Sequence, residues 1–352
     1  MKYSKSREML PAYNMTINLP KNFSPTEVFY ETVRKAKNEI HPLFYYIFTS
    51  GISVSQLGIV FDKLTVFSES DISVRHKNRT PFRIKHLAAN YLKKKIELPR
   101  EEHYIVAHDT NYQAYYHWLL ETLPRLFAAK DLLKEKILLV PSNLTHFHNA
   151  TLELFNFKDI YLIKPDEYVR IQSLTLIPHV ASKARFQASL ITEMREYILK
   201  KTLGEKGVAA ERRVFISRKK SGKRFLLNEP EIQDIVKEYG FDIICLEDLS
   251  WKEQVMLFAD TRLLVTTHGA ALANTLFMPF GSSFLEFRSS TQEHFGLSYY
   301  KLSSCLDISY YYQMCTPDLP HDYIRTNLTV DVQLLEHNLQ LMINHNESIE
   351  NS

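Results

Sequence analysis

The sequence predicts an α/β protein made of two doubly wound domains. Short apolar runs typical of buried parallel strands alternate with helical periods, and this series occurs twice between residues 100 and 290. A length of 352 residues with 45% hydrophobic content is enough for two domains of ordinary size. We therefore expect a first domain over residues 1–185, a second over residues 186–330, and a helix and tail over residues 331–352.

The first hundred residues are mixed, and the pattern becomes regular only after them. A helix is expected near Glu27–Ile40 and β structure over Gly58–Phe67. Later apolar runs predict strands at Tyr104–Ala107, Ile137–Val140, Ile160–Ile163 and Leu174–Ile177. The periodic stretches between them predict helices at Tyr115–Lys130 and Asn149–Phe155. Because Pro124 lacks a backbone N–H, we expect the first of these helices to be kinked.

The second half repeats the alternation. Apolar runs predict strands at Val214–Ser217, Phe241–Cys245, Leu263–Thr266 and Ser283–Phe287. Helical periods predict helices at Leu190–Leu203, Glu229–Tyr239 and Ser250–Ala259. Residues 330–345 are expected to form a last helix that could pack across the first domain.

Composition excludes several classes of protein. A formal net charge of +3 with 24% charged residues is too weak a footprint for nucleic-acid binding. Three cysteines form neither a metal-like spacing nor a disulfide framework, which fits a reducing compartment. Neither a signal-like nor a membrane-spanning apolar stretch occurs, so we expect a cytoplasmic protein. The basic run at residues 93–95 leaves peripheral contact with the inner face of a membrane open, and the oligomeric state is open too.

The residues after one buried strand point to phosphate binding. The strand Leu263–Thr266 is followed by four residues that open a helix: His268, Gly269, Ala270 and Ala271. Small side chains let the backbone approach a ligand closely, and the N–H groups and positive end of a helix attract phosphate. Ligands of open α/β sheets bind outside the carboxyl ends of the strands. We expect these residues to bind phosphate, with a hydrogen bond from His268; a core or loop histidine is the alternative.

Two neighbouring strands add charged residues to the predicted site. Ser217 and Arg218 stand at the end of one strand, and Arg224 lies in the loop that follows. The two guanidinium groups could clamp a diphosphate, although an exposed basic loop is the alternative. Glu286 lies in a strand of apolar residues, where a carboxylate needs a partner. A ribose diol would suit it.

A histidine and a glutamate in the first domain are candidates for acid–base chemistry. His117 and Glu121 are four residues apart, so they share one face of the predicted helix. Histidine is a suitable general base near neutral pH, and Tyr115, Tyr116 and Trp118 could stack on a sugar. A surface ion pair beside core aromatics is the alternative. No metal site is expected, because the chain has no Asp-x-Asp pair and the pair His146 and His148 lacks a third ligand.

Three blocks, YYHWLLETLPRL, VFISRKKSGKRFLLNE and LLVTTHGAALANTLFMPFGSSFLEF, resemble glycosyltransferase family 61 in order and spacing. The resemblance implies a GT-B-like fold, with two Rossmann-type doubly wound domains facing a cleft. It also implies an inverting, metal-independent transfer from a nucleoside-diphosphate sugar, with UDP-linked donors favoured, and no separate cofactor. The donor residues fall in the second and third blocks, and His117 and Glu121 fall in the first.

These observations predict a transferase for polysaccharide biosynthesis, such as that of a capsule. The acceptor would be a glycan or a lipid-linked oligosaccharide. Another nucleotide-sugar enzyme, such as an epimerase, would release a changed nucleotide sugar without any acceptor. A nucleotide-sugar- or glycan-binding module without catalysis is the remaining alternative, and substitution of His117 would then alter only binding.

Overall fold

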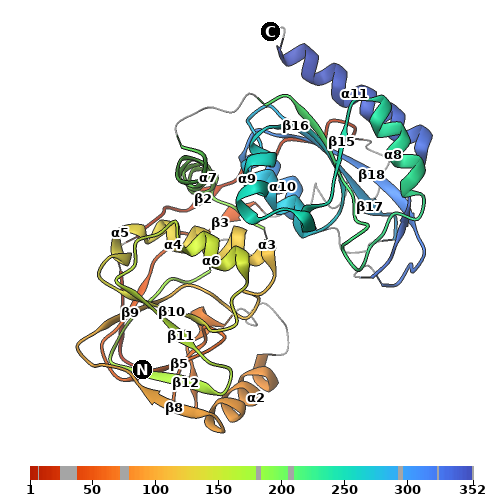
Figure 1. Cartoon of the computed structure of the whole chain (residues 1–352). Helices are drawn as coiled ribbons and strands as arrows, with labels where there is room; N and C mark the ends of the chain where they lie inside the picture. Colours follow the sequence, from red (N-terminus) through yellow and green to blue (C-terminus); the bar gives the residue numbers. More distant parts are fainter. Residues whose placement is uncertain are drawn as a thin grey trace. The chain divides into compact units, whose positions relative to one another are not determined.

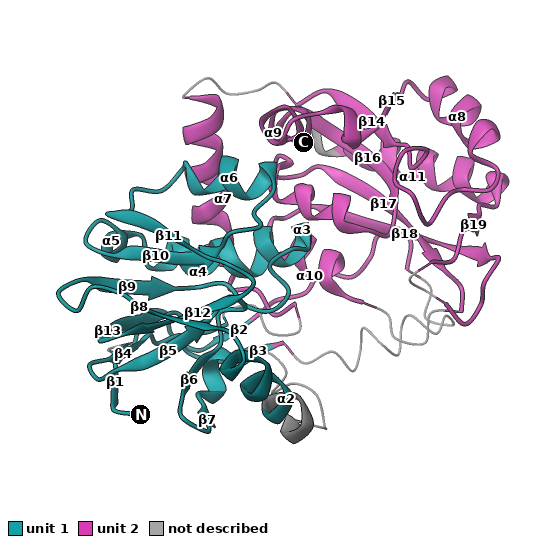
Figure 2. Cartoon of the chain, turned by 60° about the horizontal axis from the view of Figure 1, so that its bottom comes forward, with its two compact units in different colours: residues 1–14, 39–182 teal, residues 15–38, 183–352 magenta. Residues whose placement is uncertain are grey.

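The chain has a mixed α/β fold with several sheets and many helices (Figure 1). The computed structural model describes residues 1–6, 8–23, 38–71, 79–179, 184–204, 210–291, 296–322 and 325–350. Two compact units are formed: residues 1–14 with 39–182, and residues 15–38 with 183–352 (Figure 2). The helix expected near Glu27–Ile40 falls mostly outside the described residues, and Glu39–Ile40 form strand β3.

Unit 1 contains a mixed sheet packed on a second one. The first sheet has the order β1 (Tyr3–Lys5), β4 (Tyr46–Phe48), β13 (Ser173–Leu176), β9 (His103–Val106), β10 (Ile137–Pro141) and β11 (Asp159–Ile163). The last four of these strands are parallel, whereas β4 and β1 are antiparallel. The second sheet has the order β7 (Thr65–Val66), β6 (Val60–Asp62), β5 (Ile52–Ser55), β12 (Glu167–Ile171) and β8 (Lys94–Glu97).

Unit 1 therefore differs from the doubly wound domain that we expected. Buried side chains of both sheets, such as Phe48, Leu139 and Val54, belong to one core, so a sheet covers the face where crossover helices would lie in a doubly wound domain. Strands β4, β5 and β6 come from the mixed first hundred residues. Within this region β4 pairs antiparallel with β1, and β5 pairs antiparallel with β6. β2 (Tyr13–Asn14) pairs antiparallel with β3.

The helices of unit 1 include an unusual turn. They are α2 (Arg79–Tyr91), α3 (Tyr115–His117), α4 (Leu123–Ala128), α5 (Lys130–Leu133) and α6 (His146–Leu152). Between α3 and α4, a π-helical turn, η3, spans Trp118–Thr122, and the N–H of Leu123 donates to the carbonyl of Trp118. Pro124 has no N–H to donate four residues back, which explains the wider turn before it. The helix expected over Tyr115–Lys130 is thus a series of short segments.

Unit 2 is built on a largely parallel sheet. Its order is β15 (Asp242–Ile244), β14 (Arg212–Ile216), β16 (Thr261–Thr267), β17 (Ser283–Ser289), β18 (Ser309–Pro317) and β19 (Leu328–Thr329). All are parallel except β19. Counted from β14, the parallel strands have the order 2-1-3-4-5, which is typical of doubly wound sheets.

Helices lie on both sides of this sheet (Figure 1). On one side are α8 (Glu229–Glu238) and α11 (Val332–Glu350), and on the other are α7 (Ala188–Leu203), α9 (Trp251–Ala259), the 3-10 helix η5 (Ala270–Phe277) and α10 (Ser298–Cys305). Leu335, Leu339 and Met342 of α11 are buried in one core with Leu285 and Phe287 of β17. The last helix is therefore part of the core of unit 2.

A segment near the N-terminus, residues 15–38, also belongs to unit 2. The N–H of Lys21 donates to the carbonyl of Tyr310 over 2.9 Å, and Nδ2 of Asn22 donates to the carbonyl of Tyr312 over 2.7 Å. Asn22 Nδ2 also donates to Asn338 Oδ1 of α11 over 3.0 Å. These bonds tie the segment to β18 and α11, so the first domain does not take in all of residues 1–185.

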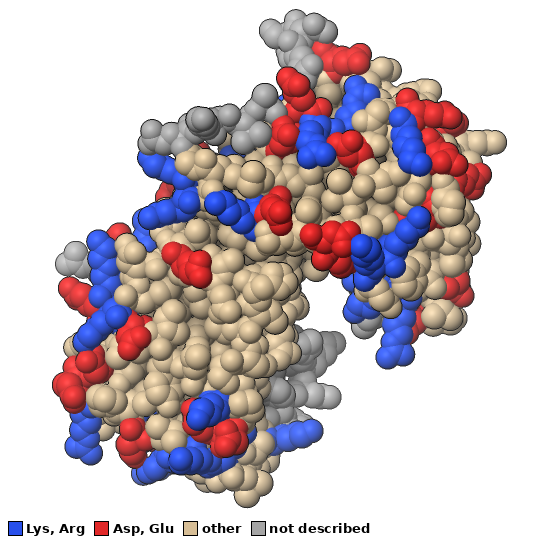
Figure 3. All heavy atoms as spheres, viewed as in Figure 1, with Lys and Arg blue, Asp and Glu red and all other residues tan. Residues whose placement is uncertain are grey.

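The surface fits the modest net charge. On the face drawn in Figure 3, basic and acidic side chains are interspersed and form no single basic patch. In the part of the chain that the structure describes, every helix is too short or too polar to cross a membrane.

Candidate functional site

The candidate site of unit 2 lies where the strand order reverses. β14 and β16 are neighbours in the sheet, but the chain leaves β14 toward β15 and returns to β16 on the other side. Crevices at such switch points, outside the carboxyl ends of the strands, are the usual ligand sites of open α/β sheets. Arg218 follows the end of β14, and His268 and Gly269 follow the end of β16.

The arginine loop and the turn after β16 meet in space. A Cβ placed on Gly269 would lie only 2.9 Å from Nη1 of Arg218, so the guanidinium packs directly on this glycine. Nη1 of Arg224 donates a hydrogen bond of 3.1 Å to the backbone carbonyl of His268. The sequence prediction that these two stretches come together is confirmed.

Neither guanidinium group has an acidic partner among the residues that the structure describes. Arg218 is buried and Arg224 is half-buried, and neither forms an ion pair with a carboxylate in the described part of the chain. Each Nε atom is buried without a hydrogen-bond partner. Burial, together with the neighbouring Arg224, lowers the pKa of Arg218 to about 10, so it remains charged near neutral pH. Unpaired buried cations are costly unless a ligand compensates them, so this arrangement is a candidate site for an anion.

The backbone of the arginine loop is itself unusual. Arg224 has φ 58°, in the left-handed region that a non-glycine residue seldom occupies. The next residue, Phe225, is held by hydrogen bonds of 2.9 Å to Asn327 and from Leu328, so the loop is fixed on both sides. Nη2 of Arg218 donates to the carbonyl of Lys223 over 3.0 Å, which closes the loop on itself. The two guanidinium groups are therefore presented by a loop that several hydrogen bonds hold in place.

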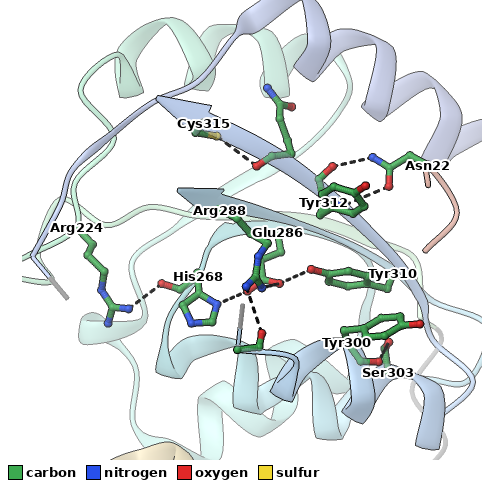
Figure 4. Close-up of polar contacts among 12 residues, drawn as sticks. Asn22, Arg224, His268, Glu286, Arg288, Tyr300, Ser303, Tyr310, Tyr312 and Cys315 are labelled. Atoms are coloured by element: carbon green, nitrogen blue, oxygen red, sulfur yellow. Dashed lines mark hydrogen bonds and ion pairs between the residues drawn. The ribbon is translucent and has the colours of Figure 1, made fainter. Parts of the chain in front are cut away.

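His268 is anchored by a buried polar network (Figure 4). Its Nδ1 forms a short hydrogen bond to Oε1 of Glu286, which lies on β17. Oε2 of Glu286 accepts from Arg288 Nη1 over 2.9 Å and from the Tyr310 hydroxyl over 2.6 Å. The side chain of Glu286 is fully buried, whereas that of His268 is 25% exposed.

This network changes the interpretation of Glu286. With no exposed surface and three donors from the protein, Glu286 has no route to a ribose, so the contact that we expected gains no support. The alternation of a strand explains the difference: Glu286 and Arg288 point to the same face of β17, and Tyr310 comes from the adjacent β18. Burial alone would raise the pKa of Glu286, but Arg288 and His268 outweigh it and lower the pKa to about 2.

The remaining predicted donor residues divide into two groups. Ala270 is exposed and Ala271 is partly exposed, and both open η5, where the first N–H groups of a helix lack acceptors within it. Ser217 is buried, and its hydroxyl donates to Glu229 at the start of α8, so it closes the loop rather than facing a ligand. Sequence reasoning missed Tyr299 of α10, whose ring contacts His268 with 5.4 Å between centroids.

Unit 1 holds a second polar cluster. Nδ1 of His117 lies 2.7 Å from Oε2 of Glu121, as the four-residue spacing predicted. Nε2 of His179 lies 3.0 Å from the same oxygen and 3.6 Å from Oδ2 of Asp109. Arg125 pairs with Asp109 and donates from Nε to the carbonyl of Glu121 over 2.8 Å. The side chain of His117 is 33% exposed and Glu121 only 3%, so the histidine is the accessible member.

Asp109, Arg125 and His179 were missed by the sequence reasoning. Asp109 follows β9 and His179 follows the adjacent parallel β13, and the carboxyl ends of parallel strands meet at one edge. Arg125 is four residues after Glu121. The strand ends and the four-residue spacing could have been noticed in the sequence. No short sequence motif, however, links these three residues to the side chains that they contact.

The same cluster is the part of the described structure that has the composition of a cation site. Ligand atoms of Asp109, Glu121 and His179 lie within 4.8 Å of one another. Arg125 already compensates Asp109, and two imidazoles contact Glu121. Burial alone would raise the pKa of Glu121, but the hydrogen bonds from His117 and His179 lower it well below its usual value. We therefore interpret the cluster as an ion-pair network.

Two aromatic and histidine candidates are structural. Trp118 is fully buried and its indole N–H donates to Thr151 over 2.7 Å, so it cannot stack on a sugar. His148 is also fully buried, with Nε2 at 2.9 Å from the carbonyl of Tyr112 and Nδ1 bonded to Thr145. Both rings fill the core beneath α6.

A sequence model of the family described as Glycosyltransferase 61 matches residues 115–285. The matched region contains His117 and Glu121, the arginine loop and the turn after β16, and it ends one residue before Glu286. The resemblance stated from the three sequence blocks is thereby confirmed. A search of curated proteins found no match.

Proposed function

We propose, from the premise that residues 115–285 belong to glycosyltransferase family 61, that the chain is an inverting, metal-independent glycosyltransferase. It would transfer a sugar from a nucleoside diphosphate, with a UDP-linked sugar as the favoured donor, to a hydroxyl of a glycan or lipid-linked oligosaccharide. A place in polysaccharide biosynthesis and a cytoplasmic location belong to the same proposal.

One observation carries the donor side of the proposal. Arg218 and Arg224 are guanidinium groups without acidic partners in the described residues. Arg218 packs on Gly269 and Arg224 donates to the carbonyl of His268, at the switch point of a parallel sheet. A diphosphate would supply the missing negative charge, and two arginines can bind it through several parallel hydrogen bonds. The N–H groups of Ala270 and Ala271 add donors at the same turn.

The acceptor side rests on His117 rather than Glu121. Glu121 is buried, and its pKa is held low, so it is a poor proton acceptor. Its carboxylate instead accepts from Nδ1 of His117, which leaves Nε2 without a hydrogen bond to any described residue. A histidine oriented in this way can accept a proton from a hydroxyl at Nε2. Glu121 would then be a positioning residue.

The proposed reaction is a single displacement. Nε2 of His117 accepts the proton of the acceptor hydroxyl while the oxygen of that hydroxyl forms a bond to C1 of the donor sugar. The bond from C1 to the diphosphate oxygen breaks on the opposite face, so the anomeric centre inverts. The nucleoside diphosphate leaves with the electron pair, and Arg218 and Arg224 stabilise its charge in place of a divalent cation.

A donor screen followed by product analysis tests this function. Thermal unfolding is measured with UDP-, GDP-, CMP- and dTDP-linked sugars, and a binding donor at a hundredfold excess over Kd should stabilise the fold by about 3 kcal/mol. The identified donor is then incubated with glycan acceptors, and products are analysed by mass spectrometry and NMR. We expect a glycoside of inverted configuration. A changed nucleotide sugar formed without acceptor would indicate an epimerase, and binding without turnover would indicate a binding module.

A further inference from the structure

The hydrogen atoms of the His268 network follow from its partners. Glu286 is an ionised carboxylate, because Arg288 and Tyr310 donate to it and hold its charge. An ionised carboxylate can only accept hydrogen bonds, so the proton of the short bond to His268 lies on Nδ1 of the imidazole. A neutral imidazole with its proton on Nδ1 has a bare lone pair on Nε2.

Nε2 is the atom of His268 that a ligand can reach. It forms no hydrogen bond with any described residue, and a quarter of the side chain is exposed. The backbone carbonyl of the same residue accepts from Arg224, and the neighbouring Gly269 carries Arg218. An anion bound by these two arginines therefore lies next to the imidazole.

Phosphate oxygens create a conflict at this position. An ionised diphosphate offers only acceptors, and a bare Nε2 is also an acceptor, so the two would repel each other. A proton on Nε2 turns this repulsion into a charge-assisted hydrogen bond. The charged or titratable groups around His268 in the described structure come from three elements. They are Glu286 and Arg288 of β17, Arg218 and Arg224 of the arginine loop, and Tyr299 of α10. Without a ligand, burial lowers the pKa of His268 and so disfavours that proton, and Arg288 and Arg224 act in the same direction against the opposite effect of Glu286.

We propose that His268 takes up one proton at Nε2 when the diphosphate of a nucleotide binds, and that Glu286, with Arg288 and Tyr310, is the positioning unit that fixes Nδ1–H. This inference rests on the proposed donor site. It gives His268 a defined role, because the imidazolium formed on binding is present when the sugar leaves and adds a third cation beside the leaving diphosphate.

Proton uptake makes nucleotide affinity depend on pH. By linkage, Kd rises about tenfold per pH unit between the pKa of His268 in the free protein and its pKa in the complex. Arginines alone would give no such dependence above about pH 7, where they stay charged and a terminal phosphate with a pKa of about 6 is already ionised.

Calorimetry on the full chain measures the proton directly. UDP, GDP, CDP, dTDP and inorganic pyrophosphate are titrated at pH 7.5 in buffers with different ionisation enthalpies, and the slope of observed heat against buffer enthalpy gives the number of protons taken up. We expect a slope close to one proton per bound nucleotide. Pyrophosphate carries a titratable proton of its own at this pH, so it serves as a test of binding alone. His268→Gln should bind more weakly with a slope near zero, and His337→Gln, an exposed histidine of α11, should keep the wild-type slope.

The outcomes separate the two proposals. Binding with the same heat in all buffers would overturn proton uptake while leaving the donor site intact. A wild-type slope in His268→Gln would place the proton elsewhere and overturn the inference too. Absence of binding by all five ligands would remove the donor site and this inference with it. Should His268→Gln fail to fold, His268→Asn is measured in its place, and a slope near one proton in that variant would overturn the inference.

Discussion

Replacing Gly269 with alanine tests whether the donor turn holds Arg218 in place. A Cβ on residue 269 would lie 2.9 Å from Nη1 of Arg218, closer than such atoms normally approach. The backbone of Gly269 is extended, with φ 175°, so alanine can adopt it without strain. The substitution should therefore act by displacing the guanidinium and leave the turn itself intact.

The size of the effect follows from the contacts that Arg218 would lose. Charge-assisted hydrogen bonds to a diphosphate contribute about 1.5–3 kcal/mol, which corresponds to about 10- to 150-fold weaker nucleotide binding. The folded protein loses at most the bond from Arg218 to the carbonyl of Lys223, worth about 1 kcal/mol. Affinity should fall far more than stability.

Calorimetry with the nucleotide identified in the donor screen measures this difference. Gly51→Ala is a matched control, because its Cβ would lie 3.0 Å from Nη2 of Arg170, and both residues belong to unit 1, whereas the donor turn belongs to unit 2. We expect unchanged nucleotide affinity in that control. The alanine at 269 should also cost little once Arg218 is already replaced by alanine. Unchanged binding in Gly269→Ala, or an equal loss without Arg218, would refute the reasoning.

Three further predictions follow from the two clusters. His117→Gln should lower kcat by about 10²- to 10⁴-fold without changing donor affinity, whereas His146→Gln, which replaces an exposed histidine, should leave kcat unchanged. Transfer should persist in EDTA; activity lost in EDTA and restored by Mn²⁺ would instead favour a cation at the Asp109 cluster. The pKa of Glu286 is lowered from 4.5 to about 2 in the folded protein. Its ionisation therefore stabilises the fold at any pH above the pKa of the unfolded state, and this contribution is lost as the pH falls from about 4.5 to about 2. Glu286→Gln should therefore be less stable at pH 7 and show a flatter acid dependence in thermal melts; an unchanged acid dependence would contradict this role.

The meeting of the arginine loop with the turn after β16 could be predicted from the sequence because its signals are local, whereas their role in donor binding stays a prediction. Arg218 and His268 each follow an apolar run, and strand ends in a parallel sheet meet at one edge. The role of Glu286 was not predictable in this way, since its partner Tyr310 comes from a different strand and its register with Glu286 exists only in the folded sheet. Arg288, two residues later on the same face, was the one local hint.

Unit 1 was harder to predict for physical reasons. Its antiparallel strands, such as Ile52–Ser55 and Val60–Asp62, are short and carry little periodic pattern. The assignment of His117 and Glu121 to one helix face held, but the π-helical turn before Pro124 depends on backbone hydrogen bonds that no side-chain pattern reveals. His179 reaches Glu121 across 58 residues of sequence, a contact that only the sheet order creates.

Nucleotide binding to an Arg218→Gln/Arg224→Gln double variant tests the central claim most directly. Glutamine keeps polar side chains at both positions but removes the two charges that lack acidic partners in the described structure. If these arginines hold the diphosphate, the calorimetric Kd of the nucleoside diphosphate should rise at least about 100-fold, while the variant keeps a cooperative thermal transition. A folded double variant that binds the nucleotide as tightly as the wild type would contradict the account.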